Sequence, residues 1–141
     1  MEEMIEDIQN EIVEQLEKIE DVPTVSAWQG DINDLLKTPQ KLPALRVIFQ
    51  EALFDEKNTI GGDQPALTLN YLVVLVGKNL RRRDAGGEAC YPIIGKTLGA
   101  LTGHNVPGYD YLWPRRVDLI FAEGGILAYG MTFSMYTIWQ K

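Results

Sequence analysis

The sequence has few of the residues that build metal centres and nucleophilic sites, with one cysteine, Cys90, and one histidine, His104. A single cysteine cannot form an intrachain disulfide, which fits a reducing compartment or a protein that does not use disulfides. These two residues alone cannot supply the four ligands of a usual structural zinc site. We therefore predict no metal and no cofactor. Cys90 is interpreted as a buried apolar residue and His104 as an exposed loop residue, while a general-base role for His104, or its pairing with Cys90, stays open.

Long hydrophobic runs and phosphate-binding motifs are also missing. The first residues have no basic start and no continuous apolar stretch, so they are not expected to form a signal peptide. No apolar run approaches the roughly 18 residues of a membrane span, and we predict no membrane contact. The tripeptide Gly95-Lys96-Thr97 lacks the glycine that a phosphate-binding loop places five residues earlier, where Cys90 stands. With no catalytic motif in view, we predict that the protein is not an enzyme.

Negative charge is concentrated in one segment. The formal net charge is −7, but residues 1–21 hold nine acids and one base, so that segment carries −8 and the rest of the chain +1. A broad nucleic-acid or anionic-membrane surface would need a basic face, which this distribution does not provide. We therefore predict no sequence-specific nucleic-acid binding.

Residues 2–20 show the periodicity of an amphipathic helix, because isoleucine and leucine recur there at spacings of three and four. Pro23 then disfavours helix in the residue before it. The opposite face is almost wholly acidic and includes Glu6, Glu14 and Glu17. Acids near a helix C-terminus oppose the helix dipole, so this face is more acidic than helix stability requires. It is either an ordinary solvated face or a docking surface.

The remaining pattern predicts an α+β domain spanning residues 1–141, with a mixed or antiparallel sheet of about five strands and two helices in the order α-β-β-β-α-β-β. No βαβ repeat of a Rossmann or barrel fold is evident. Residues 31–36 suggest a helical turn, and the strand at 66–77 is expected to be buried on both faces in its second half. The predicted strands are 24–28, 44–53, 66–77, 113–122 and 126–139, with hairpins joining the second to the third and the fourth to the fifth.

The second helix is predicted over residues 88–101, after a basic, glycine-ended loop at 78–87. Pro92 would then fall in the first turn of the helix, where proline is tolerated. The four-residue spacing of Gly95 and Gly99 would let another backbone approach closely. In the last hairpin, Val117, Leu119 and Phe121 alternate with more polar neighbours and are expected to share one face.

The loop at 78–87 contains the sharpest cluster of positive charge, with Lys78 close to three consecutive arginines. Arginine forks can grip phosphate or carboxylates, so the cluster is a solvated loop, a protein–protein contact or, least favoured, a nucleic-acid contact. The arginines of one copy could meet the acidic helix of the next and close a ring head-to-tail. The candidate interface residues are Lys78, Arg81, Arg82, Arg83, Glu6, Glu14 and Glu17.

The order and spacing of several segments resemble the Mu-like phage and prophage small tail protein family, of the tail terminator (tail completion) type. No single motif is diagnostic, and the resemblance extends over most of the chain. The segments are the IxxEIVEQLEKI helix, WQGD at Trp28–Asp31, LPALRVIF, YLVVLVGKNLR at Tyr71–Arg81, the glycine-rich lead into a helix, and LIFAEGGILAYGMTFSM at Leu119–Met135.

The resemblance implies a structural virion protein without catalytic residues. Such a protein forms a ring, typically a hexamer, at the head-proximal end of the tail tube, where it ends tube polymerisation and prepares head joining. Its partners would be further copies of itself, the tail tube protein and the head–tail connector protein. It would reside in the virion tail and in the host bacterial cytoplasm during assembly, and it can be a monomer before it reaches the tube. A head–tail connector or another minor tail or baseplate component is the alternative, and a small ligand-binding domain or enzyme is a more distant one.

Overall fold

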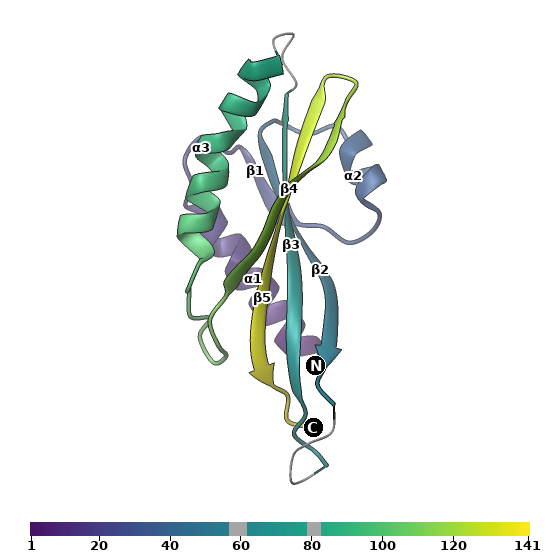
Figure 1. The fold of residues 1–141 in the computed structure, drawn as a ribbon, viewed down its shortest axis with the longest axis vertical. Helices are drawn as coiled ribbons and strands as arrows, with labels where there is room; N and C mark the ends of the chain where they lie inside the picture. Colours follow the sequence, from purple (N-terminus) through teal and green to yellow (C-terminus); the bar gives the residue numbers. More distant parts are fainter. Residues whose placement is uncertain (57–61, 79–82) are drawn as a thin grey trace.

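Five strands form one mixed sheet in the order β1-β2-β3-β5-β4, with three helices packed on it (Figure 1). The structure is a computed structural model and describes residues 1–56, 62–78 and 83–141. The α+β prediction is confirmed, but a third helix stands where the sequence suggested only a helical turn. The elements are α1 (Glu2–Glu17), β1 (Thr24–Ala27), α2 (Ile32–Lys37), β2 (Ala44–Phe54), β3 (Ala66–Lys78), α3 (Arg83–Leu101), β4 (Trp113–Glu123) and β5 (Ile126–Ile138).

The extra helix α2 connects two parallel strands. Asp31 caps its N-terminus, because the side-chain carboxylate accepts a hydrogen bond of 2.9 Å from the backbone N–H of Asn33. β1 then pairs with β2 in parallel, from Thr24 opposite Ala44 to Ala27 opposite Val47. The chain therefore contains one βαβ crossover, which the predicted order did not include. The pairs β2–β3 and β4–β5 are antiparallel, as the two predicted hairpins require, and β3 and β5 also pair in antiparallel.

The main hydrophobic core lies between one face of the sheet and the helices α1 and α3. Helix α1 ends at Glu17, three residues short of the prediction that placed its end at residue 20, and it buries the expected stripe of apolar side chains. Burying each such side chain contributes roughly 1.5–3 kcal/mol, so the periodic stripe is what holds the helix on the sheet. The buried apolar residues of α1 are Met4, Ile8, Ile12 and Leu16.

A smaller core covers part of the opposite face of the sheet. Leu35 and Leu36 of α2 pack there against Val74 and Val76 of β3 and against Ala128 of β5. Strand β3 is consequently buried on both faces in its second half, as predicted. Because α2 is short, it leaves the rest of this face without a covering helix (Figure 1).

Helix α3 departs from the prediction in three ways. It begins at Arg83 rather than at residue 88, so Pro92 lies inside the helix and not in its first turn. Its outer side is exposed at Gly95 and Gly99. A Cβ atom built at either glycine would meet nothing within 4 Å, so no other part of the described chain approaches there. The close backbone approach predicted from the glycine spacing is absent within this chain, apart from the residues that the structure does not describe.

The β4–β5 hairpin turns at Gly124 and Gly125, whose φ angles of 60° and 79° are those that a two-residue hairpin turn requires. Strand β4 contains two register irregularities, between Pro114 and Arg116 and between Leu119 and Phe121. The second one moves Phe121 to the opposite face, where it packs beside the smaller core. The prediction that Val117, Leu119 and Phe121 share one face was therefore wrong.

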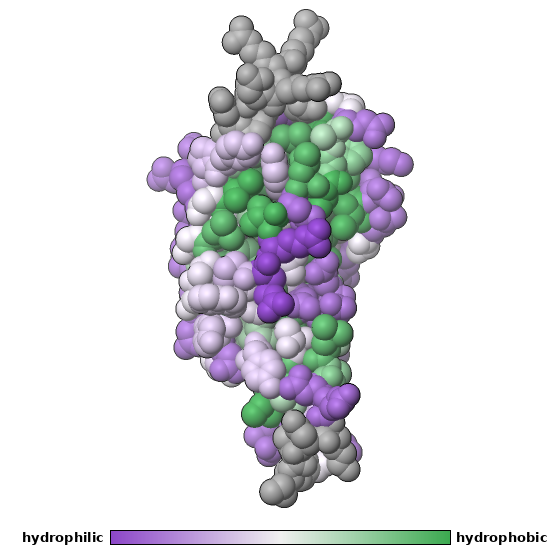
Figure 2. Space-filling view, viewed as in Figure 1, coloured by the Kyte–Doolittle hydropathy of each residue, from purple (hydrophilic) through white to green (hydrophobic). Residues whose placement is uncertain are grey.

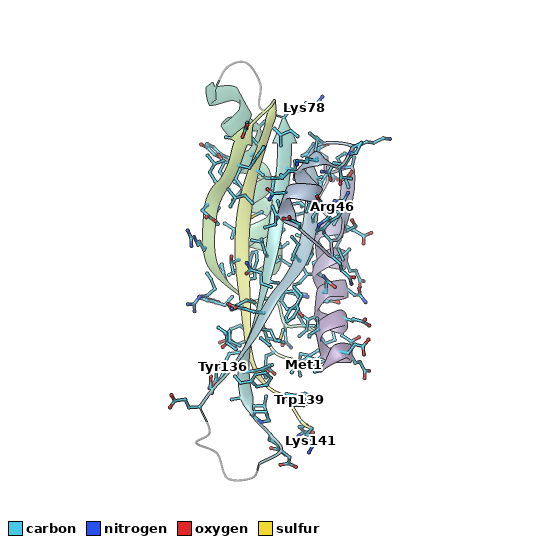
Figure 3. All side chains as sticks on the ribbon, turned by 90° about the vertical axis from the view of Figure 1, so that its right-hand side faces the viewer. Met1, Arg46, Lys78, Tyr136, Trp139 and Lys141 are labelled. Carbon is cyan, nitrogen blue, oxygen red and sulfur yellow. The ribbon has the colours of Figure 1, made fainter. Side chains whose placement is uncertain are left out.

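The two ends of the molecule carry different parts of the chain. Lys78 lies at one end of the long axis, while Met1, Trp139 and Lys141 lie towards the other (Figure 3). None of the helices in the described residues is long and apolar enough to cross a membrane.

Candidate functional site

The acidic face of α1 is divided between structural and free carboxylates. Asp7 accepts a hydrogen bond of 2.8 Å from the hydroxyl of Tyr109, and Glu11 lies 2.9 Å from Nε2 of His104. Both partners belong to the loop before β4, so these two acids fasten α1 to that loop. The predicted interface residues Glu6, Glu14 and Glu17 are exposed along the same helix.

The acids near the end of α1 are not explained by helix stability. The first turn contains Glu2 and Glu3, which suit the positive end of the helix dipole, but the last turn holds no basic residue and ends at Glu17. Carboxylates at the C-terminal end are unfavourable by a few tenths of a kcal/mol. A charged partner outside the chain would offset that cost, which favours a docking surface.

Only part of the predicted basic cluster is described. Lys78 is the exposed last residue of β3, and Arg83 begins α3. Arg81 and Arg82 lie outside the described residues. Lys78 and Met1 lie towards opposite ends of the molecule (Figure 3). The basic end of β3 and the first turn of the acidic helix are thus separated within one copy, and could meet only between copies.

His104 is not the exposed loop residue that the sequence predicted. Its side chain is 25% exposed and that of Glu11 is 17% exposed, and the hydrogen bond from His104 lowers the pKa of the Glu11 carboxyl below its ordinary value. Cys90 is buried as predicted, and burial raises the pKa of its thiol. The thiol lies beside Gly77 near the end of β3, whereas His104 follows the last turn of α3. Several turns of α3 separate Cys90 from His104, and each residue of a helix adds about 1.5 Å. The two side chains are therefore too far apart to form a catalytic pair.

The described part of the chain contains no candidate metal-binding site. No group of three or more His, Cys, Asp or Glu side chains stands close enough there to hold a metal ion.

Sequence reasoning did not predict that β4 is an exposed apolar edge strand. β4 is an edge strand with exposed fractions of 55% at Trp113, 42% at Val117 and 52% at Leu119. Natural proteins usually shield long apolar edges, because their unpaired N–H and C=O groups recruit other strands. Period-two alternation could not reveal this exposure, because it depends on which strand ends the sheet.

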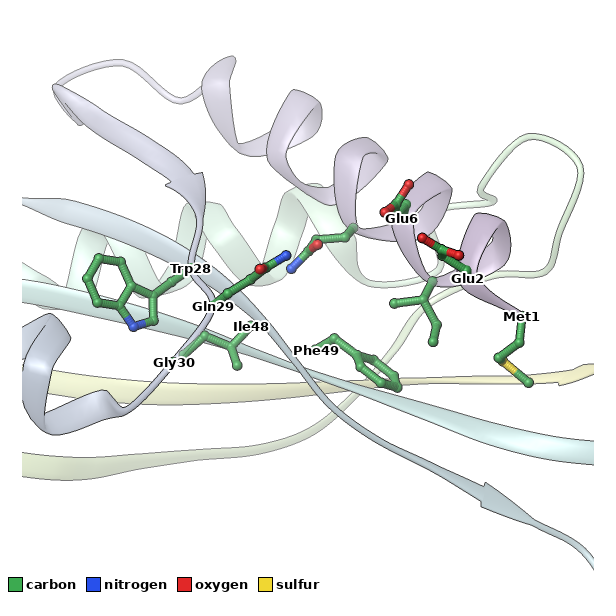
Figure 4. Close-up of a pocket in the computed structure, with 10 residues that line it drawn as sticks. Met1, Glu2, Glu6, Trp28, Gln29, Gly30, Ile48 and Phe49 are labelled. Carbon is green, nitrogen blue, oxygen red and sulfur yellow. The ribbon is translucent and has the colours of Figure 1, made fainter.

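A groove lies between α1 and β2, near the edge of the sheet that is opposite to β4. It encloses about 560 Å³ and is lined by Ile5 of α1, by Ile48 and Phe49 of β2, and by Trp28 after β1 (Figure 4). The acids Glu2 and Glu6 stand at the helix side of the groove. The groove exists because β1 ends at Ala27, opposite Val47, while β2 continues to Phe54.

The part of the second sheet face that α2 does not cover has a floor of polar side chains and a rim of aromatic side chains. Ser134 donates to the side-chain oxygen of Asn70, whose amide donates in turn to Glu51 at 3.1 Å. Trp113 and Tyr136 stand exposed beside this floor. Figure 2 shows the face as a mixture of hydrophilic and hydrophobic patches rather than a continuous apolar surface.

No protein-family model matches the sequence, and no curated protein matches it. The fold is similar to that of solved structures. One of them is a chain in the virion of a native gene transfer agent (GTA) particle, with a TM-score of 0.60 and 12% sequence identity. The match covers 91% of this chain and 92% of the other, so the likeness concerns nearly the whole of both chains. At this identity it shows a common fold.

Proposed function

We propose that the chain is a structural subunit of a phage-like particle, and that it forms the ring that ends the tail tube. The observation that carries the proposal is the fold likeness to a chain of a gene transfer agent virion, which extends over 91% of this chain. The resemblance of the sequence to tail terminator proteins supports the finer role. The ring would be a hexamer in the virion tail, assembled in the host bacterial cytoplasm.

The surfaces of the chain suit an assembly subunit better than an enzyme. Cys90 is buried, and His104 is hydrogen-bonded to Glu11. By contrast, an apolar edge strand, an acidic helix face and an open groove are all exposed. Such surfaces allow several protein contacts at once, which a subunit between the tail tube protein and the head–tail connector protein needs.

Ending a tube requires an asymmetric subunit. Stacked rings of identical subunits continue to grow unless one subunit presents a face that matches the tube and another face that does not. The two ends of this molecule carry different segments of the chain, with Lys78 at one end and the termini towards the other (Figure 3). That asymmetry supports a terminating role.

Localisation on purified particles tests the proposal. Gold-labelled antibodies against the chain should bind at the head-proximal end of the tail in electron micrographs of headless tails. Label at the far end would instead assign the chain to the baseplate, and label only at the neck of complete particles would favour a connector. Particles that contain no copy of the chain would contradict a structural role altogether.

A further inference from the structure

Apart from the outer edge of the four-residue strand β1, the sheet has two strand edges that pair with nothing in the described residues. One is the outer edge of β4, because β4 closes the strand order next to β5 and makes no backbone hydrogen bond to another element there. The other is the second half of β2, Ile48–Phe54, which continues beyond the end of β1. The free edges therefore stand on opposite sides of the same sheet.

The directions of these two edges are compatible. β2 is antiparallel to β3, β3 to β5, and β5 to β4, so β4 runs opposite to β2. A second copy can stand beside the first with its sheet face and its long axis in the same orientation. Its β4 would then lie antiparallel to the free part of β2 in the first copy. Antiparallel addition of a strand to an exposed edge is a common mode of protein recognition.

The lengths and apolar side chains are compatible as well. Strand β4 has 11 residues, so it is long enough to cover the free part of β2, Ile48–Phe54. Val117 and Leu119 pair with Met131 and Tyr129, which places both on the face that α1 covers. In a sheet continued into the next copy, these two exposed side chains would face the groove between α1 and β2 (Figure 4).

Charge favours the same pairing. Arg116 of β4 and Glu51 of β2 are both exposed, and their pairing with Thr132 and Asn70 places both on the second face of the sheet. In a sheet continued into the next copy, the two side chains would lie on the same face. Opposite charges at the rim of an interface steer association and fix its register.

We propose that β4 of one copy adds to the free edge of β2 of the next copy, with Leu119 entering the groove beside Phe49. The contact is heterologous, since the two surfaces differ, and such contacts close into rings when the rotation between copies permits. The interpretation of the ring as the end of a tail tube rests on the proposed function. The contact between two copies is tested independently of that function.

Photo-cross-linking in the producing cells tests the contact. A benzophenone amino acid replaces Leu119, cells are irradiated during particle assembly, and cross-linked peptides are identified by mass spectrometry. We expect a product of two copies in which position 119 is joined to residues 1–9 or 48–54. A matched variant carries the same group at Gly99, which is exposed on the outer side of α3 and where a side chain would meet nothing within 4 Å. Joining of position 119 to another protein, to other residues of the chain, or no more often than position 99, overturns the proposal.

A charge at the same position supplies a second measurement. Leu119→Lys should abolish the copy-to-copy product formed by a benzophenone group placed at Phe49, because a lysine on an edge strand opposes strand addition. Gly99→Lys should leave that product unchanged, and circular dichroism should show both variants folded. Persistence of the product in Leu119→Lys contradicts the contact. A cross-link between copies, together with normal tails after gene deletion, would support the contact and refute the tail function. A tail defect after gene deletion, without a cross-link between copies, would support the tail function and refute the contact.

Discussion

The Nε2 atom of His104 lies 2.9 Å from Oε1 of Glu11, although 93 positions separate the two residues in sequence. The pair joins the loop before β4 to the middle of α1, and Tyr109 adds a second link to Asp7 at 2.8 Å. The acidic helix is thus fixed by two polar contacts as well as by its apolar stripe. Its position relative to β4 and to the groove depends on these contacts.

Replacing Glu11 by glutamine should reduce the free energy of unfolding by about 1 kcal/mol at neutral pH, because a partly buried hydrogen bond to a carboxylate is replaced by a weaker one to a neutral amide. The folded-state pKa of Glu11 lies below its ordinary value of 4.5. The stabilisation is therefore present above pH 4.5 and is lost as the pH falls through the lower folded-state pKa. Urea unfolding of both proteins over this range should show their stabilities converging in acid.

The control for that series is Glu14→Gln, since Glu14 is exposed on the same helix. Its unfolding free energy should stay close to that of the unmodified protein at every pH. If Glu11→Gln and Glu14→Gln behave alike, the ion pair does not hold the helix.

Replacing Gly77 by alanine should destabilise the protein by about 1–3 kcal/mol through overpacking. The added Cβ would lie 2.9 Å from Sγ of Cys90, inside the contact between β3 and α3. Cys90→Ala removes that sulfur, so the double variant should be more stable than the sum of the two single effects predicts. Thermal or urea unfolding of the four proteins measures this; strictly additive effects would show that the clash is relieved elsewhere.

The thiol of Cys90 should react slowly in the folded protein. Burial raises its pKa, which lowers the thiolate fraction, and it also blocks access to the sulfur. Alkylation by iodoacetamide at mildly alkaline pH, followed by mass spectrometry, should be slow for the native protein and fast in denaturant. Because the chain has one cysteine, the mass change reports this site alone. Equal rates in the two conditions would show that Cys90 is accessible.

Helix α1 and the central hairpin could be predicted because their signals are local. Isoleucine and leucine at helical spacing identified α1, and the doubly apolar second half of β3 marked the centre of the sheet. Such patterns follow from the side-chain period of each element. The same reasoning indicated the acidic face on which Glu6, Glu14 and Glu17 lie.

The start of α3 was not predicted, because local propensity indicated a loop where the helix begins. Gly86 and Gly87 each lower helix propensity by about 1 kcal/mol relative to alanine, which indicated a loop. The helix nevertheless runs through them from Arg83, and further along it packs Cys90 and Ile93 into the main core.

The exposed edges and the His104–Glu11 pair were missed for a different reason. Both depend on which segments meet in space, and a bulge between Leu119 and Phe121 also changes which face each side chain occupies. The alternation of apolar and polar residues along a strand indicates neither the exposed edges nor the His104–Glu11 pair.

Charge reversal tests the candidate basic cluster that the structure describes only in part. Changing Arg81, Arg82 and Arg83 together to glutamate should weaken ring formation or docking on the tube, if these arginines meet the acidic helix of a neighbouring copy. Sedimentation of assembled tails from complemented cells, with the chain detected in each fraction, measures the effect. Normal incorporation of the variant would show that the cluster is only solvated.

The length of tails made without the chain tests the central claim most directly. Electron micrographs of particles from a strain in which its gene is deleted should show tails of uncontrolled length that carry no heads. A supplied copy of the gene should restore uniform tails joined to heads. Normal particles with tails of uniform length from the deletion strain would contradict the account.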